Sequence, residues 1–71
     1  MNHHEIIYDV LAALGDRTLS TGEIIPGLKV WSPTRRELSG FLSAYMENRY
    51  VEKIRNYKGA QRLVKWRVLA R

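Results

Sequence analysis

Cysteine is absent from this sequence of 71 residues, so no disulfide can support the fold. Without cysteine, His3 and His4 cannot by themselves form a structural zinc site. They are also adjacent in the chain, so on a helix they project to different sides and make a poor metal-binding pair. We therefore expect neither a metal ion nor another cofactor, and the fold must be held by the packing of one small core.

Long apolar runs are also missing. The longest run is far below the roughly 20 residues that span a bilayer, and the N-terminus lacks the apolar segment of a signal peptide. We expect an intracellular protein, cytoplasmic or nucleoid-associated, with no membrane partner. No serine, histidine and carboxylate set has supportive spacing, and no glycine-rich phosphate loop occurs. We therefore expect neither an enzyme active site nor a small-molecule ligand.

Acidic residues are missing from one end of the chain. Residues 53–71 contain no acid, whereas residues 1–28 contain a single basic residue, Arg17, and several acids. The basic residues of the C-terminal end are Lys53, Arg55, Lys58, Arg62, Lys65, Arg67 and Arg71. A basic end of this kind, in a chain of formal charge +5, is the usual footprint of phosphate binding, although a charge run is also common on a merely solvated face.

Residues 2–15 predict an amphipathic helix. Asn2 and Glu5 have the spacing of a reciprocal capping box, and Gly15 is a suitable C-terminal residue. The core-facing stripe covers an arc of about 160° at about 100° per residue. It consists of Ile6, Ile7, Val10, Leu11, Ala13 and Leu14. Tyr8 and Ala12 lie beyond this arc, so the helix is apolar over more of its surface than one small core needs.

Residues 18–31 predict a short edge strand and an irregular helix. Thr18 and Leu19 form the candidate strand, and the spacing of Ser20 to Glu23 repeats the capping box that opens a helix. Pro26 opposes regular hydrogen bonding inside that helix, so we expect it to be short or kinked. In the loop that follows, Trp31 is expected either to staple the next helix or to join the core between helices.

Residues 33–48 predict a third helix, for which two N-caps are possible. Ser32 can cap it with Pro33 at the first helical position, or Thr34 can cap it together with Glu37. The buried face is given by Leu38, Phe41, Leu42, Tyr45 and Met46. The opposite face is small and basic, which suits close approach to a nucleic acid. It contains Arg35, Arg36, Ser39, Gly40 and Ser43.

Residues 50–55 and 62–69 predict a β-hairpin, joined by a connection rich in turn-forming residues. In the second strand, the apolar residues that we expect to face the core are Val64, Trp66 and Val68. Lys65 lies between them in the alternation and should point outward, while Tyr57 falls at the tip, where we expect it to be exposed. The other basic residues that would decorate the hairpin are Lys53, Arg55, Lys58 and Arg62.

In this order, the elements resemble the winged helix-turn-helix family over essentially the whole chain. The segment "TRRELSGFLSAYMENRYVEKI" is similar to a recognition helix that runs into the first wing strand, and "RNYKGAQR" is similar to a wing tip. The family commonly has glycine just before this strand, where this chain has Arg49, so Asn48 or Arg49 must take a left-handed conformation, asparagine more easily. The resemblance implies one α+β domain, residues 1–71, with three helices and a C-terminal two-stranded wing.

The resemblance also implies a small transcriptional regulator that binds double-stranded DNA. The recognition helix, residues 33–48, would lie in the major groove, and the wing, residues 50–69, on the backbone or the minor groove. The candidate contacts of the helix are Ser32, Thr34, Arg35, Arg36, Ser39, Gly40 and Ser43. Those of the wing are Lys53, Arg55, Tyr57, Lys58, Arg62 and Lys65. The alternative is a winged-helix module for protein interaction or assembly, without sequence-specific DNA binding.

Within the recognition helix, the two adjacent arginines have different expected roles. Arg36 shares the exposed face of Ser39, which favours contact with base edges, whereas Arg35 lies about 100° around the helix and is better placed for a phosphate.

We also expect a homodimer, because a single domain of this size reads only a few base pairs. The acidic N-terminal halves would meet, and the basic halves would point towards DNA. The like charges of Glu5 and Asp9 oppose this contact. The candidate interface residues are Ile7, Tyr8, Leu11 and Ala12.

Overall fold

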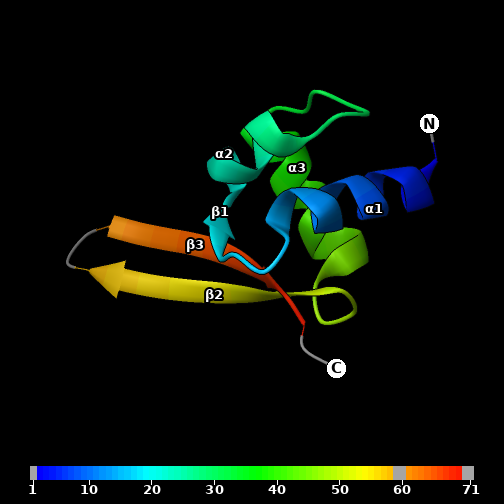
Figure 1. Cartoon of the computed structure of the whole chain (residues 1–71). Helices are drawn as coiled ribbons and strands as arrows, with labels where there is room; N and C mark the ends of the chain where they lie inside the picture. The colour runs from blue at the N-terminus through cyan, green and yellow to red at the C-terminus, as the bar shows by residue number, and fades with distance from the viewer. Residues whose placement is uncertain (1, 59–60, 70–71) are drawn as a thin grey trace.

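The computed structural model describes residues 2–58 and 61–69, which form an α+β fold with three α-helices and a three-stranded antiparallel sheet. The helices are α1 (His3–Leu14), α2 (Thr21–Ile24) and α3 (Arg35–Phe41). The strands are β1 (Leu19–Ser20), β2 (Val51–Lys58) and β3 (Gln61–Val68), in the order β1-β3-β2. The helices gather at one end, and the β2–β3 hairpin extends away from them (Figure 1). Within the described ranges, no helix is long and apolar enough to cross a membrane.

Helix α1 begins and ends as its sequence predicts. The Asn2 Oδ1 atom accepts a hydrogen bond from the Glu5 backbone N–H over 2.9 Å, but the Glu5 side chain makes no return bond to Asn2, so the expected box is only half formed. Gly15 adopts a φ of 58°, where a side chain would be strained, and its N–H donates to the Leu11 carbonyl. The predicted stripe is buried, except for Leu11, which is partly buried against the core.

Helix α2 is short and irregular, as Pro26 indicates. Ser20 and Glu23 form the complete capping box, and after one turn the chain passes into the 3-10 turn η1 (Ile25–Gly27). The pKa of the Glu23 carboxyl is held below its usual value, mainly by the hydrogen bond that it accepts from the Ser20 backbone N–H. A hydrogen bond with the Ser20 side chain lowers this pKa further. The ionised Glu23 carboxylate therefore contributes to the stability of the fold. This contribution is fully present at a pH above the pKa of an unfolded glutamate, and it is lost as the pH falls through the lowered pKa.

Helix α3 begins two residues later than residues 33–48 predict, because Thr34 is its N-cap and Ser32 is not. Thr34 and Glu37 form a capping box, in which each side chain accepts a hydrogen bond from the other residue's backbone N–H. Ser32 has Arg35 three residues further on, which cannot complete such a box. Thr34, which can form the reciprocal pair, is therefore the N-cap. Pro33 precedes the helix and is buried.

The C-terminal part of the predicted helix is also different. After α3, the π-helical segment η2 (Leu42–Met46) continues the helix, and the Glu47 N–H donates to the Leu42 carbonyl over 2.8 Å. Asn48 then adopts a φ of 64°, which confirms the expected left-handed residue before β2. The helical segment therefore ends at Met46, two residues earlier than predicted.

The strands pair differently at their ends from the prediction. β1 is one residue later than expected and places Leu19 opposite Trp66. The hairpin strands are longer and their connection is shorter, because the ladder continues to Lys58 opposite Gln61 despite the turn-forming composition. The alternation in β3 is confirmed, since Trp66 is fully buried while the flanking Val64 and Val68 pack partly buried against the core.

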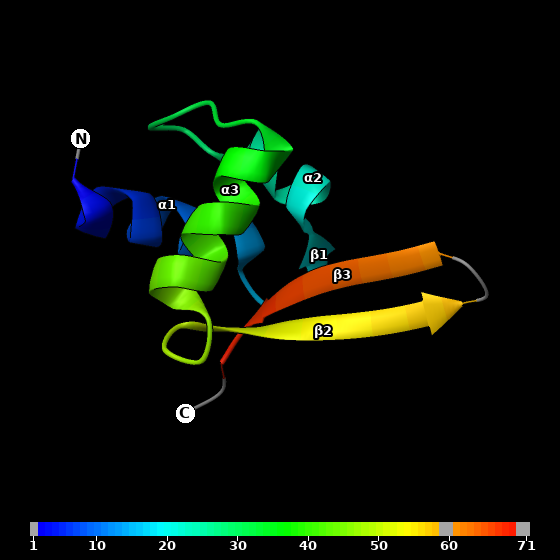
Figure 2. The same ribbon diagram turned by 180° about the vertical axis from the view of Figure 1, so that it is seen from behind.

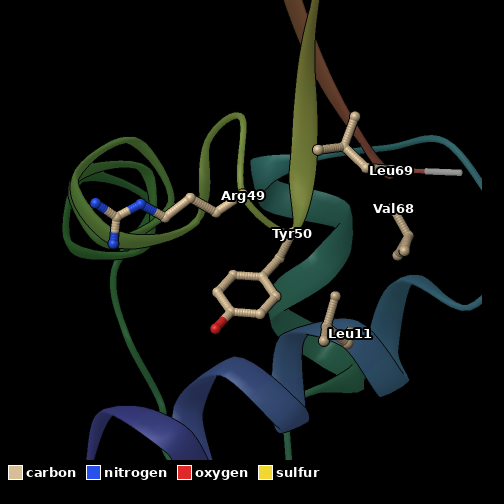
Figure 3. Close-up of a pocket in the computed structure, with 5 residues that line it drawn as sticks. All are labelled: Leu11, Arg49, Tyr50, Val68 and Leu69. Carbon is tan, nitrogen blue, oxygen red and sulfur yellow. The ribbon is translucent and has the colours of Figure 1, made fainter. Parts of the chain in front are cut away.

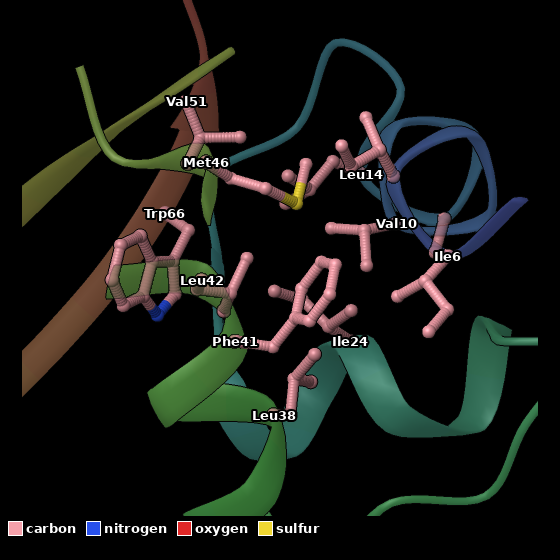
Figure 4. Packing of buried hydrophobic residues seen from close by; sticks show 12 residues of the cluster. Ile6, Val10, Leu14, Ile24, Leu38, Phe41, Leu42, Met46, Val51 and Trp66 are labelled. Carbon is pink, nitrogen blue, oxygen red and sulfur yellow. The ribbon is translucent and has the colours of Figure 1, made fainter. Parts of the chain in front are cut away.

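One hydrophobic core joins the three helices to the sheet (Figure 4). Trp66 is its largest fully buried side chain, and its indole Nε1 donates to the Thr21 Oγ1 atom over 2.9 Å, so the buried N–H is satisfied. Of the two positions expected for Trp31, the structure has the core position: its ring lies edge-on to Phe41, with centroids 5.7 Å apart. The other fully buried side chains are Val10, Leu14, Ile24, Leu38, Leu42, Met46 and Val51.

Candidate nucleic-acid interface

One side of α3 and η2 is free of the core, and we call its residues Arg36, Ser39, Gly40 and Ser43 the outer face of α3. They fall within an arc of about 100° at about 100° per residue. Three of them are exposed and Ser39 is half-buried, while Leu38 and Phe41 hold the opposite side in the core. Figure 2 shows α3 in front, with the hairpin leaving beside it. The helix and the hairpin can therefore meet the same ligand.

Gly40 has no packing role on this face. A Cβ atom added at Gly40 would meet no other atom within 4 Å, and its φ is not positive. A glycine inside a helix lowers the stability of the protein by about 0.5–1 kcal/mol relative to alanine. No packing contact of Gly40 offsets this loss. What Gly40 does provide, together with Ser39 and Ser43, is a low surface that leaves the helix backbone open to close approach.

The two adjacent arginines of α3 have different surroundings. Both are exposed, but the Arg35 guanidinium lies against α2, where a Cβ added at Gly22 would be 2.8 Å from the Arg35 Nε atom. Arg36 lies on the outer face, about 100° around the helix. The helix thus directs one arginine towards its neighbour α2 and leaves the other among small side chains.

The residues before α3 contribute less than the sequence suggests. Ser32 lies in the loop, outside the helix, and is exposed. Thr34 is exposed as well, but its Oγ1 atom already accepts a hydrogen bond from the Glu37 backbone N–H over 3.1 Å. Both hydroxyls can still donate a hydrogen bond to a phosphate at this end of the helix.

Basic residues occupy both faces of the hairpin. The register places Lys53 opposite Trp66 and Ile54 opposite Lys65, and residues directly opposite each other share a face. Lys53 and Arg55 therefore lie on the side of the buried Trp66, and Lys65 lies on the reverse side. A ligand on the helix side of the hairpin would meet the first two and not the third.

Two of these cations feel neighbouring side chains. The Lys53 Nζ atom lies over the Trp66 ring, 5.6 Å from its centroid. Lys65 is close enough to Glu23 to lower the pKa of that carboxyl further, beyond the effect of its hydrogen bonds. Arg55 is exposed on the helix side. Among the hairpin cations whose side chains are described, Arg55 is the best placed for a ligand.

The expected wing-tip contacts lie outside what the structure describes. The backbone of Tyr57 pairs with that of Arg62 in the ladder, and Lys58 pairs with Gln61. The side chains of Tyr57, Lys58 and Arg62 are not among the described residues. Their proposed contacts therefore stay predictions from the sequence.

Asp9 holds the loop that leads to α3, a role that sequence reasoning missed. Its side chain is 8% exposed. Its carboxylate oxygens accept hydrogen bonds from the backbone N–H groups of Lys29 and Val30, over 2.9 to 3.0 Å. A signal was present, because Asp9 lies within about 40° of Ala13 on the helical wheel, at the edge of the core stripe. This tether joins α1 to the segment that precedes the outer face of α3.

Three of the four candidate dimer residues, Ile7, Tyr8 and Leu11, line two adjoining hollows beside α1. The larger, of about 310 Å³, is lined by Leu11, Arg49, Tyr50, Val68 and Leu69 (Figure 3). The smaller, of about 140 Å³, is lined by His4, Ile7, Tyr8, Leu11 and Tyr50. Tyr8 is 72% exposed, whereas Ile7 is 8% exposed and packs mainly in the core, so it can offer a partner only a small part of its side chain. Ala12 is exposed but lines neither hollow.

Comparisons with known proteins give no relative for this chain. Searches with protein-family models, among curated proteins and among solved structures found no significant match. The layout of three helices and a three-stranded antiparallel sheet is compatible with a winged helix, and no fold match identifies it as one.

Proposed function

We propose that this chain is a sequence-specific, double-stranded DNA-binding protein of the winged helix-turn-helix type, acting as a small transcriptional regulator. The outer face of α3 is the observation that carries the proposal. There Arg36 stands beside Ser39, Gly40 and Ser43, so a cation that can recognise guanine lies on a surface low enough to enter the major groove. A helix in that groove contacts base edges chiefly from its N-terminal half, where Arg36 lies.

The hairpin supports the proposal because it offers a second surface that can contact DNA. Lys53 and Arg55 share the face of the hairpin on which Trp66 packs against the helices, so they can approach the backbone of a duplex that α3 has entered. Lysine and arginine in this position neutralise phosphates and add affinity without reading sequence. The helix would then specify the site, and the wing would strengthen binding to any site.

The direct test is a selection of bound duplexes from a random pool, followed by titration of the selected duplex at several salt concentrations. We expect a recovered consensus and an affinity that falls with salt, with a log–log slope of about −0.9 for each phosphate contact. Recovery of no consensus, together with affinity insensitive to salt, would instead favour the alternative of a protein-interaction module.

Replacing Gly40 with alanine should stabilise the protein and weaken its binding to DNA. The free energy of unfolding should rise by about 0.5–1 kcal/mol, because alanine is the better helix former and its Cβ meets no neighbour. Affinity for the selected duplex should fall, and fall further in Gly40→Leu, because each added group keeps the helix further from the groove. Urea unfolding and fluorescence anisotropy measure the two effects. Both variants binding as tightly as the original would mean that the outer face is not in close contact.

We further propose that the protein reads DNA as a homodimer joined through the hollows beside α1. Tyr8 stands exposed next to apolar walls, so a two-fold axis near it would place the Tyr8 ring of each protomer in the hollow of the other. Asp9 does not oppose this contact, because its carboxylate is buried on loop N–H groups. Glu5 stays at the surface, and antiparallel pairing of two α1 helices brings it towards Arg49 at the end of the larger hollow.

Replacing Tyr8 with glutamate should convert this dimer to a monomer. Light scattering should give twice the chain mass of 8.3 kDa for the original protein and the single mass for the variant. The matched control is Val30→Ser, since Val30 is also an exposed apolar residue but lines neither hollow. The original protein at the single mass, both free and bound to DNA, would contradict the proposed dimer.

A further inference from the structure

Gly22 is a glycine that the backbone does not require. It is the second residue of α2, and its φ is not positive, so alanine could adopt the same conformation. The three atoms nearest to an added Cβ all belong to one side chain, at 2.8 Å for Nε, 3.1 Å for Cζ and 3.2 Å for Nη2 of Arg35. A Cβ does not come within 3.0 Å of such an atom, so the Arg35 guanidinium occupies the space that glycine leaves.

The Arg35 guanidinium packs against Gly22 and keeps its charge. Among residues 2–58 and 61–69, the salt bridge in the structure joins Arg67 to Glu52. Within these ranges, no carboxylate lies within salt-bridge distance of the Arg35 guanidinium. Arg35 is also exposed, so its remaining N–H groups face solvent. A guanidinium that is held in place and still charged can bind an anion at a lower entropic cost than a freely moving one.

We propose that Gly22 is a positioning residue, and that it holds Arg35 ready to contact a DNA backbone phosphate beside the groove that α3 enters. This inference depends on the proposed function. Arg35 lies about 100° around the helix from Arg36, on the side of α2, so a duplex that meets Arg36 with its base edges presents the flanking backbone on that side. An arginine guanidinium suits this role because its planar N–H groups match the geometry of phosphate oxygens.

Gly22→Ala is a sharp test, because it moves Arg35 with little harm to the fold. The atoms that must shift are the far end of a flexible side chain. Alanine is also the better helix former, so we expect the free energy of unfolding to be unchanged or higher. Affinity should fall roughly 10-fold, the size of one charge-assisted hydrogen bond, and by the same factor for every duplex. The log–log salt slope should become shallower by about 0.9.

A double-mutant cycle links the effect to Arg35. Arg35→Ala should produce the same uniform loss, and the double variant with Gly22→Ala should bind no more weakly than Arg35→Ala alone. The control background is Arg35→Lys, because a lysine ammonium lacks the planar group that rests on Gly22, so Gly22→Ala should cost it nothing. Unchanged affinity in Gly22→Ala, or the same loss with and without the Arg35 side chain, would overturn the positioning role.

A measurement without DNA separates this inference from the proposed function. The side-chain Nε–H of Arg35 should give a heteronuclear NOE typical of an ordered group in the original protein, and a lower value in Gly22→Ala. Equal mobility in the two proteins would overturn the positioning of Arg35. An ordered Arg35 in a protein that binds no duplex would instead overturn the proposed DNA-binding function and leave the contact between Gly22 and Arg35 in place.

Discussion

Replacing Asp9 with alanine should lower the free energy of unfolding by about 3 kcal/mol, the largest effect that we expect from a single substitution of a charged residue. The variant loses charge-assisted hydrogen bonds to the Lys29 and Val30 N–H groups and leaves these donors without an acceptor. Domains typically have about 0.05–0.15 kcal/mol of stability per residue, so this loss is a large fraction of the total. Urea unfolding followed by circular dichroism measures it.

Two further variants identify the cause of that loss. Asp9→Asn keeps one oxygen acceptor and the shape of the side chain, so it should lose less than alanine. Asp16→Ala removes an exposed acid that follows α1, so it should change the free energy of unfolding by no more than about 0.5 kcal/mol. A loss in Asp9→Ala no greater than in Asp16→Ala would show that the loop does not depend on this carboxylate.

Replacing Arg36 with alanine should weaken binding to the selected duplex by about 1–3 kcal/mol, which is roughly 5- to 150-fold. It should also relax selectivity at one or two base pairs, because a bidentate contact with a guanine would be lost. The fold should be intact, since Arg36 is exposed and lies on the outer face of α3. Anisotropy titrations of the selected duplex and of its single-base-pair variants measure the affinity and the preference together.

Arg35→Ala is the matched control for this prediction. It removes the same charge one residue away, but its expected contact is a phosphate, so all duplexes should weaken alike and the preference should remain. If Arg36→Ala also weakened all duplexes by one factor, α3 would only position the protein. Sequence would then have to be read by the wing or through DNA shape.

The local features of the fold could be predicted because each has a local cause. The stripe on α1, the cap at Ser20 and the left-handed Asn48 are decided by residues within a turn of one another. Spacing alone allows either Ser32 or Thr34 to be the N-cap of α3. Thr34 is the N-cap because Glu37 returns its hydrogen bond. Spacing alone was thus sufficient to outline the elements but not to fix their ends.

The contacts that position the candidate site could not be predicted in this way. Asp9 meets a loop 20 residues further along the chain, and Arg35 meets Gly22 across two helices. No periodic pattern encodes such pairs, because each depends on how the packed helices approach one another. The small side chains on the outer face of α3 could be predicted from the sequence. The distribution of the hairpin cations over two faces could not, because it depends on the strand register that pairs Lys53 with Trp66.

The π-helical segment η2 is equivalent to a single-residue insertion in a regular helix. Residues after such an insertion are rotated by about 100° relative to a helix that lacks it. Arg36 and Gly40 precede the segment, and Met46 is its last residue, with its side chain fully buried. Deleting one residue between 42 and 46 would therefore restore a regular helix and turn the entry to β2 away from the core.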